Sequence, residues 1–173
     1  MPSSRVVCYT ALVTLSQIDI GEPTWSEASE ARRHEWRNAI QGMLDEEVLQ
    51  IRADAHRMTI DATEQALHLT LHDADQAMLD EVHIPHDRLA KHIQEYVDLV
   101  RELAKADGSG ITRLEALDMA KKVAHDRAAD TIERLCAPFK IDHETARRLY
   151  TLLLTLRVDT TRLVGLNGHR RVR

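Results

Sequence analysis

The sequence predicts an α+β fold: a small N-terminal antiparallel sheet of three to four strands with one amphipathic helix, followed by a C-terminal three-helix bundle. Two observations predict it. Between residues 48 and 84, short segments alternate apolar and polar residues, which is typical of strands. From residue 85 onward, apolar residues recur at spacings of three and four, as in amphipathic helices. We expect residues 1–157 to form a single α+β domain and residues 158–173 to form a basic, loosely ordered tail.

The bulk composition is that of one globular domain and argues against several classes of protein. The 173 residues carry a formal net charge of −5, whereas nucleic-acid-binding domains are usually basic. No stretch approaches the ~18 apolar residues of a membrane helix, and the N-terminus lacks the apolar region of an export signal. We therefore expect a cytoplasmic protein without a membrane partner. Cys8 and Cys136 lie far apart in sequence and are expected to be free and reduced.

The N-terminal part predicts a strand and then a helix. Residues 5–15 are rich in valine, leucine and threonine, which favours a strand, and Ile18 and Ile20 could extend it. A helix follows, which Thr24 or Ser26 can cap. Its apolar stripe consists of Trp36, Ile40, Met43 and Leu44.

Four short segments supply the remaining candidate strands. They are closely spaced and leave no room for crossover helices between them, so the sheet should be antiparallel. The segments are residues 48–52, 56–61, 67–72 and 78–84, with a turn at 73–76.

Two long helices are predicted after the sheet. Pro85 suits the first turn of a helix with a strong apolar stripe, and residues 107–110 end that helix. Thr112 and Glu115 then form a capping-box pattern at the start of a second helix. This helix should extend to about Cys136.

A third helix is predicted at residues 143–156, after Pro138 has ended the second. Asp142 can cap it. Its leucines surround the helix and do not form a single stripe. Such a helix is usually central in a core or lies at a partner interface.

Several runs of residues in the C-terminal half resemble one bacterial family. These are residues 115–120 (EALDMA), 124–126 (AHD), 133–135 (ERL), 141–142 (ID) and 145–152 (TARRLYTL). They are similar to runs in the proteobacterial uncharacterised protein family 0262, and His34-Glu35 matches it in the first helix. The resemblance covers about residues 5–157 and is dense over 115–152. Ala120 and Asp126 stand where the family has glycine and asparagine, which indicates a divergent member.

The resemblance implies a bacterial cytoplasmic protein with this order of elements. It implies no activity, because the family has none assigned. Any function must therefore be argued from the residues themselves.

His125 and Asp118 are the candidate catalytic residues. A histidine near a carboxylate can act as a general base. The two lie seven residues apart on one side of a helix, or ~11 Å along its axis, so direct contact needs a third partner. The simpler interpretation is that His125 makes a structural hydrogen bond.

Arg147 and Arg148 are the candidate anion-binding residues. Adjacent arginines near the start of a helix can bind a phosphate or a carboxylate. Ion pairs with acids on the preceding helix are the structural alternative. His34 and Glu35 are further candidates, although a solvated pair is the simpler explanation.

The ten histidines raise the question of a metal site. His68 and His72 lie ~13 Å apart in an extended strand, too far to share an ion. His83, His86 and His92 lack the i, i+4 spacing of a zinc motif. We therefore expect neither a metal site nor a cofactor.

Two functions from different classes remain. The first is a non-enzymatic interaction or regulatory module, most simply a homodimer that associates through residues 149–156 or a sheet edge, with another protein as an alternative partner. The second is a small enzyme or anion-binding domain with a site between the last two helices. Nucleic-acid binding through the arginine-rich tail is disfavoured, because no groove-reading helix accompanies the tail.

Overall fold

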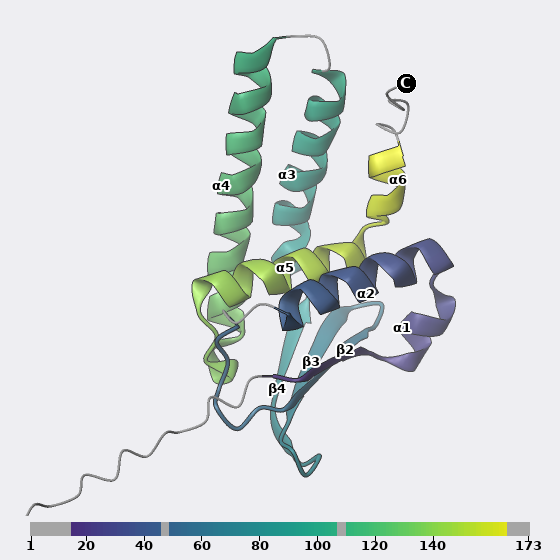
Figure 1. Ribbon diagram of the computed structural model, residues 1–173, viewed down its shortest axis with the longest axis vertical. Helices are drawn as coiled ribbons and strands as arrows, with labels where there is room; N and C mark the ends of the chain where they lie inside the picture. The colour runs from purple at the N-terminus through teal and green to yellow at the C-terminus, as the bar shows by residue number, and fades with distance from the viewer. Residues whose placement is uncertain (1–14, 46–48, 107–109, 166–173) are drawn as a thin grey trace, which may run out of the picture.

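The computed structural model describes residues 15–45, 49–106 and 110–165, and it has the predicted α+β class (Figure 1). Four strands form one sheet in the order β1-β2-β3-β4. β2, β3 and β4 are consecutive antiparallel neighbours, as their spacing predicted. The strands are β1 (Gln17–Ile20), β2 (Arg57–Ala62), β3 (Ala66–His72) and β4 (Met78–Pro85).

The prediction of a wholly antiparallel sheet is wrong at β1. This strand pairs with β2 in parallel, with Ile18 opposite Met58. The chain between β1 and β2 contains two helices, and a helical crossover returns a strand in the same direction. Residues 5–14 of the first predicted strand lie outside the described residues.

Residues 49–52 are not a strand, in contrast to the prediction for 48–52. The Arg52 amide donates to the carbonyl of Phe139 at 2.9 Å. The backbone of this segment is therefore hydrogen-bonded to the connection between two helices, while the Arg52 side chain forms an ion pair with Asp80 of β4. Residues 46–48 lie outside the described residues.

The first predicted helix is in fact two helices. α1 (Glu22–Glu27) ends at Ala28, whose backbone is extended, and α2 (Glu30–Leu44) follows. The Ser29 hydroxyl accepts from the Arg32 amide at 3.3 Å, so Ser29 caps α2 in place of the predicted Thr24 or Ser26. The Arg33 side chain donates to the carbonyls of Trp25 and Ser26, both at 2.9 Å, and satisfies the end of α1.

The three later helices do not form the predicted three-helix bundle. α3 (His86–Lys105) and α4 (Ile111–Leu135) pair and project away from the sheet, whereas α5 (His143–Arg157) lies beside α2 over the sheet (Figure 1). α4 packs against both α3 and α5. The short 3₁₀ turn η1 (Ala137–Phe139) redirects the chain between α4 and α5.

The two predicted helix caps have different outcomes. The Asp142 carboxylate accepts from the Thr145 amide at 2.9 Å, so the predicted cap of α5 is confirmed. α4 instead begins after Gly110, which has φ of 97° and makes no side-chain cap. Thr112 therefore lies inside the helix, and the capping box is wrong. A positive φ suits glycine, and this local geometry sets the start of α4.

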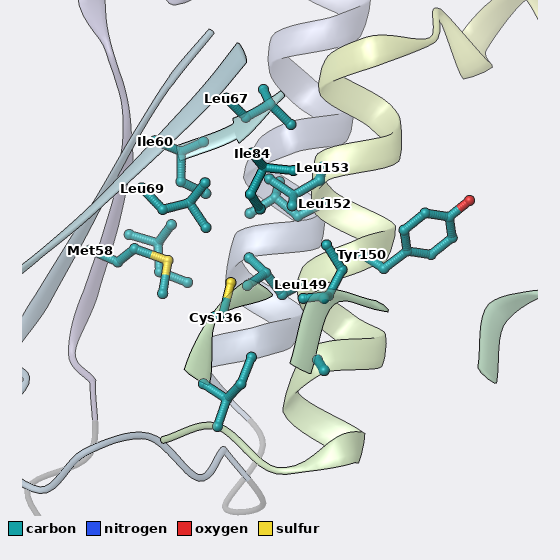
Figure 2. Packing of buried hydrophobic residues seen from close by; sticks show 14 of the residues in the cluster. Met58, Ile60, Leu67, Leu69, Ile84, Cys136, Leu149, Tyr150, Leu152 and Leu153 are labelled. Atoms are coloured by element: carbon teal, nitrogen blue, oxygen red, sulfur yellow. The ribbon is translucent and has the colours of Figure 1, made fainter. Parts of the chain in front are cut away.

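α5 lies at the centre of the core. Leu149, Leu152 and Leu153 are fully buried and face the apolar side of the sheet, which carries Ile60 and Ile84 (Figure 2). Leu154 and Leu156 are also buried. The all-round apolar pattern thus reflects a central helix, and these leucines are not available as a surface of the folded chain.

The residues directly after α5 form a short helix. α6 (Thr160–Gly165) stands where a loosely ordered tail was expected to start, and the buried Thr160 hydroxyl donates to the Glu35 carboxylate. Residues 166–173 lie outside the described part of the chain. Cys136 is a free, buried thiol, whereas Cys8 lies outside the described residues. None of the helices in the described ranges is long and apolar enough to cross a membrane.

Candidate functional site

A groove with a volume of about 340 Å³ lies between α4 and α5. We call it the α4–α5 groove. Four of its lining side chains are lysine or arginine, and two are acidic. The lining residues are Asp118, Lys121, Lys122 and His125 of α4, and Glu144, Arg147, Arg148 and Thr151 of α5.

The two helices contribute to the groove with the same spacing. On each helix the lining residues are at positions i, i+3, i+4 and i+7, counted from Asp118 on α4 and from Glu144 on α5. Residues at this spacing share one face of a helix. The groove is therefore lined by two polar stripes that face each other, one from α4 and one from α5.

Four predicted site residues are brought together in this groove. His125, Asp118, Arg147 and Arg148 all line it. The predictions missed four lining residues, whose spacing from Asp118 and Arg148 could have revealed them: Lys121, Lys122, Glu144 and Thr151. His34 and Glu35 lie elsewhere on α2 and do not contribute to this groove.

His125 does not form a dyad with Asp118. The Asp118 carboxylate instead lies 3.1 Å from the Lys122 ammonium, one turn along α4. The His125 ring packs edge-on against two tyrosines, with centroid distances of 5.1 Å to Tyr96 and 5.4 Å to Tyr150. It is held by aromatic packing, and no carboxylate of the residues that the structure describes hydrogen-bonds to it.

Burial keeps the His125 imidazole neutral. Desolvation, followed by the positive charges of Lys121 and Arg147, lowers its pKa to about 4, while Asp126 acts weakly in the opposite direction. Its Nε2 is buried and has no hydrogen-bond partner among the described residues. In its neutral form the ring carries one N–H donor, and at neutral pH it adds no charge to the groove.

The two arginines make exposed ion pairs. Arg148 lies 3.0 Å from Glu144 on its own helix, and Arg147 Nε lies 3.3 Å from Asp126 of α4. Lys121 contacts an aromatic face, with its Nζ 5.8 Å from the ring centroid of Tyr96. The structural alternative for the arginines is thus present, with Asp126 of α4 as the acidic partner of Arg147.

The start of α5 is occupied by acidic groups. His143 Nδ1 lies 3.3 Å from Asp130 and 3.6 Å from Glu133, and Asp142 already accepts from the Thr145 amide. An anion would meet carboxylates at this helix terminus. Any anion-binding capacity therefore belongs to the groove further along α5, where the side chains are basic.

Glu35 and His34 have separate surroundings on α2. Glu35 accepts from the Thr160 hydroxyl and connects α2 to α6. His34 is exposed to solvent. Their adjacency in sequence therefore does not make a joint site.

Comparison with known proteins identifies a family. The model of an uncharacterised protein family, UPF0262, matches residues 13–159. The chain belongs to the UPF0262 family. The predicted resemblance is confirmed, and the modest identities to other members are those of a divergent member.

Two UPF0262 proteins match over most of their length. The protein of Erythrobacter litoralis is 28% identical over 155 residues, covering 83% of this chain and 96% of the relative. That of Novosphingobium aromaticivorans is 29% identical over 159 residues, with the same coverage of 83% and 96%. A Rhodopseudomonas palustris member is 47% identical over 45 residues, which is 25% of this chain and 28% of the relative. No solved structure matches the chain.

Proposed function

We propose that this UPF0262 member binds a small anion, such as a phosphate or carboxylate compound, in the α4–α5 groove. The observation that carries the proposal is the pair of facing stripes, which gathers four cationic side chains around one groove of a chain with net charge −5. The volume of about 340 Å³ lies at the lower end of the range of small-molecule sites.

Both arginines of the groove already have carboxylate partners, which a ligand would have to replace. The Arg148–Glu144 and Arg147–Asp126 pairs are partly solvated, and exposed pairs contribute only ~0–1 kcal/mol. A phosphate or carboxylate can engage a guanidinium through two parallel hydrogen bonds and can replace such a partner. Lys121 would add a positive charge without breaking a carboxylate pair.

Binding, without a reaction, is the function that the contacts support. A general base needs a partner that orients it and a pKa near the working pH. His125 is packed between tyrosines and its pKa is near 4, so it is a weak base and serves better as a neutral hydrogen-bond donor. This favours the anion-binding form of the hypothesis over the enzymatic form.

The proposal is tested by titrating the full chain with inorganic phosphate and pyrophosphate, followed by backbone amide NMR shifts. We expect shifts centred on residues 118–125 and 144–151. R147A should weaken binding by roughly tenfold or more, in line with the loss of a charge-assisted pair. R157A is the matched control, because Arg157 is exposed on the same helix but outside the groove lining. Equal weakening by both variants would indicate diffuse electrostatic attraction and refute the site.

A second candidate function is self-association through α4. The leucines between residues 149 and 156 are inside the core, so they do not provide the interface proposed from the sequence. The first half of α4 instead exposes Ile111 at 77% and Met119 at 60%, and such apolar exposure favours a partner surface. The partner that we propose for this surface of α4 is a second copy of the chain.

Light scattering after size exclusion tests this candidate. A wild-type dimer that becomes monomeric on M119K would support it. A monomeric wild type at micromolar concentration would refute it, and would leave the anion site unaffected.

A further inference from the structure

The sheet has one polar face, on the side opposite the buried leucines. There, His68 of β3 lies directly opposite His83 of β4, and the two rings have centroids 4.2 Å apart. Glu81 lies two residues before His83 on the same strand, and its Oε1 is 2.7 Å from His83 Nε2. One ligand-type atom from each of the three side chains lies within 4.8 Å of the other two.

We propose that His68, Glu81 and His83 bind a divalent transition-metal ion of the Zn²⁺ class. Two imidazole nitrogens and one carboxylate oxygen are ligands that such ions prefer over the all-oxygen sites of Mg²⁺ or Ca²⁺. Ligand atoms about 2.0–2.1 Å from a tetrahedral Zn²⁺ lie ~3.3 Å from one another. Small side-chain rotations would bring these three groups to that spacing.

The contact between Glu81 and His83 shows how an ion would enter. A histidine N–H and a carboxylate already meet at 2.7 Å, so the proton between them occupies the place that a metal ion would take. Because metal ligands must be deprotonated, an ion that binds here would displace this proton.

The three proposed ligands project from strands that are fixed by hydrogen bonds. β3 is hydrogen-bonded on both sides, by β2 and by β4, and the pairing of His68 with His83 belongs to a continuous ladder. His83 and Glu81 are about half exposed, with side chains at 52% and 43%. A bound ion would thus have three protein ligands and a solvent-facing position for water or a further ligand.

Spacing along the chain alone does not predict this metal site. Along the chain, the neighbour of His68 on its own strand is His72, and His83 is followed by His86 at the start of the next helix. The neighbour that matters is His83 on the adjacent strand, because the register of β3 and β4 places it directly opposite His68.

A second group, formed by Asp130, Glu133 and His143, provides an internal comparison. Its ligand atoms also lie within 4.8 Å of one another, but it offers a single nitrogen with two carboxylates. Arg147, paired with the neighbouring Asp126, adds a positive charge nearby. We therefore favour the sheet site for a zinc-class ion.

The test is a calorimetric Zn²⁺ titration of the full chain, without an affinity tag and in a buffer that does not bind zinc. We expect one ion per chain. H68A and H83A should each weaken binding roughly tenfold or more, because even residues behind the ligands contribute 10–100-fold in known sites. E81Q keeps the shape of the side chain but removes the charge, and it should also weaken binding. Far-UV circular dichroism would verify that each variant is folded.

H72A and H143A are the controls. His72 is a half-buried histidine of β3, four residues from His68, and His143 belongs to the competing group. Both variants should bind zinc as the wild type does. The proposal is overturned if the wild type takes up no zinc, if H143A but not H68A loses binding, or if H72A weakens it as much as H68A. The proposed metal ligands lie on the sheet, away from the lining of the α4–α5 groove. The effect of H68A on zinc binding and the effect of R147A on anion binding are therefore independent measurements.

Discussion

The indole Nε1 of Trp36 donates a hydrogen bond to the main-chain carbonyl of Thr155 at 3.1 Å. This bond joins α2 to the last turn of α5, where carbonyls lack helical partners. Arg32 donates to the same carbonyl at 3.1 Å and to that of Leu156 at 3.0 Å. Side chains of α2 therefore cap α5, the helix that carries Arg147 and Arg148.

Replacing Trp36 should show how much this connection between α2 and α5 contributes to the stability of the chain. W36F keeps an aromatic ring at a position that is 1% exposed but removes the donor and part of the volume. We expect the free energy of unfolding to fall by about 1–3 kcal/mol, from the lost hydrogen bond and the space left behind. Urea denaturation measures it. H34A changes an exposed neighbour on α2 and should stay within ~0.5 kcal/mol of the wild type; similar losses in both variants would contradict the assignment.

The cap of α5 can be tested separately. The Asp142 carboxylate accepts from the Thr145 amide at 2.9 Å, so D142A leaves that amide without its partner. The expected loss is about 1 kcal/mol in urea denaturation. D142S retains a capping oxygen and should recover most of it. An unchanged midpoint for D142A would mean that the cap contributes nothing to stability.

Elements that depend on local pattern were predictable from the sequence, whereas the long-range pairing of β1 with β2 was not. The period of two located β2, β3 and β4 to within about two residues, because a strand with one buried face must alternate. The parallel pairing of Ile18 with Met58 depends on the crossover between them. The break at Ala28 depends on Arg33 reaching back to the end of α1.

The same distinction applies to the candidate sites. His125 and Arg147 come together because each lies on a regular helix and the two helices pack side by side. Helical spacing alone could have added Lys121 to this group. The pairing of His68 with His83 requires the strand register, which no periodicity in the sequence specifies.

A steric relationship between Gly21 and Asp61 leads to a further prediction. A Cβ on Gly21 would lie 1.4 Å from Asp61 Oδ1 and 2.5 Å from its Cγ, so the carboxylate occupies the space beside the glycine. G21A should therefore destabilise the chain by about 1 kcal/mol, because the Asp61 side chain must move. In the D61A background this penalty should largely disappear. A double-mutant cycle in urea would show a coupling of at least ~0.5 kcal/mol, and strictly additive effects would rule out the clash.

The buried imidazole of His125 makes stability depend on pH. Its pKa is about 4 in the folded chain, against 6.5 for an ordinary histidine, because burial and the charges of Lys121 and Arg147 disfavour the cation. Above pH 6.5 both folded and unfolded chains hold a neutral ring, and its contribution is fully present. Between pH 6.5 and 4 only the unfolded chain takes up the proton, so stability falls with falling pH.

The measurement is the free energy of unfolding from urea titrations at pH 7 and pH 5. His125 is partly solvated, so we expect it to account for only about 1 kcal/mol of the difference between these two values. H125Q cannot titrate and should show a correspondingly smaller loss, whereas H34Q, at an exposed position on α2, should follow the wild type. His92, whose pKa burial also lowers, contributes equally to all three chains and cancels in the comparison. Parallel pH profiles for wild type and H125Q would mean that the ring is already solvated in the folded chain, and the account of His125 as a neutral donor in the α4–α5 groove would fail with it.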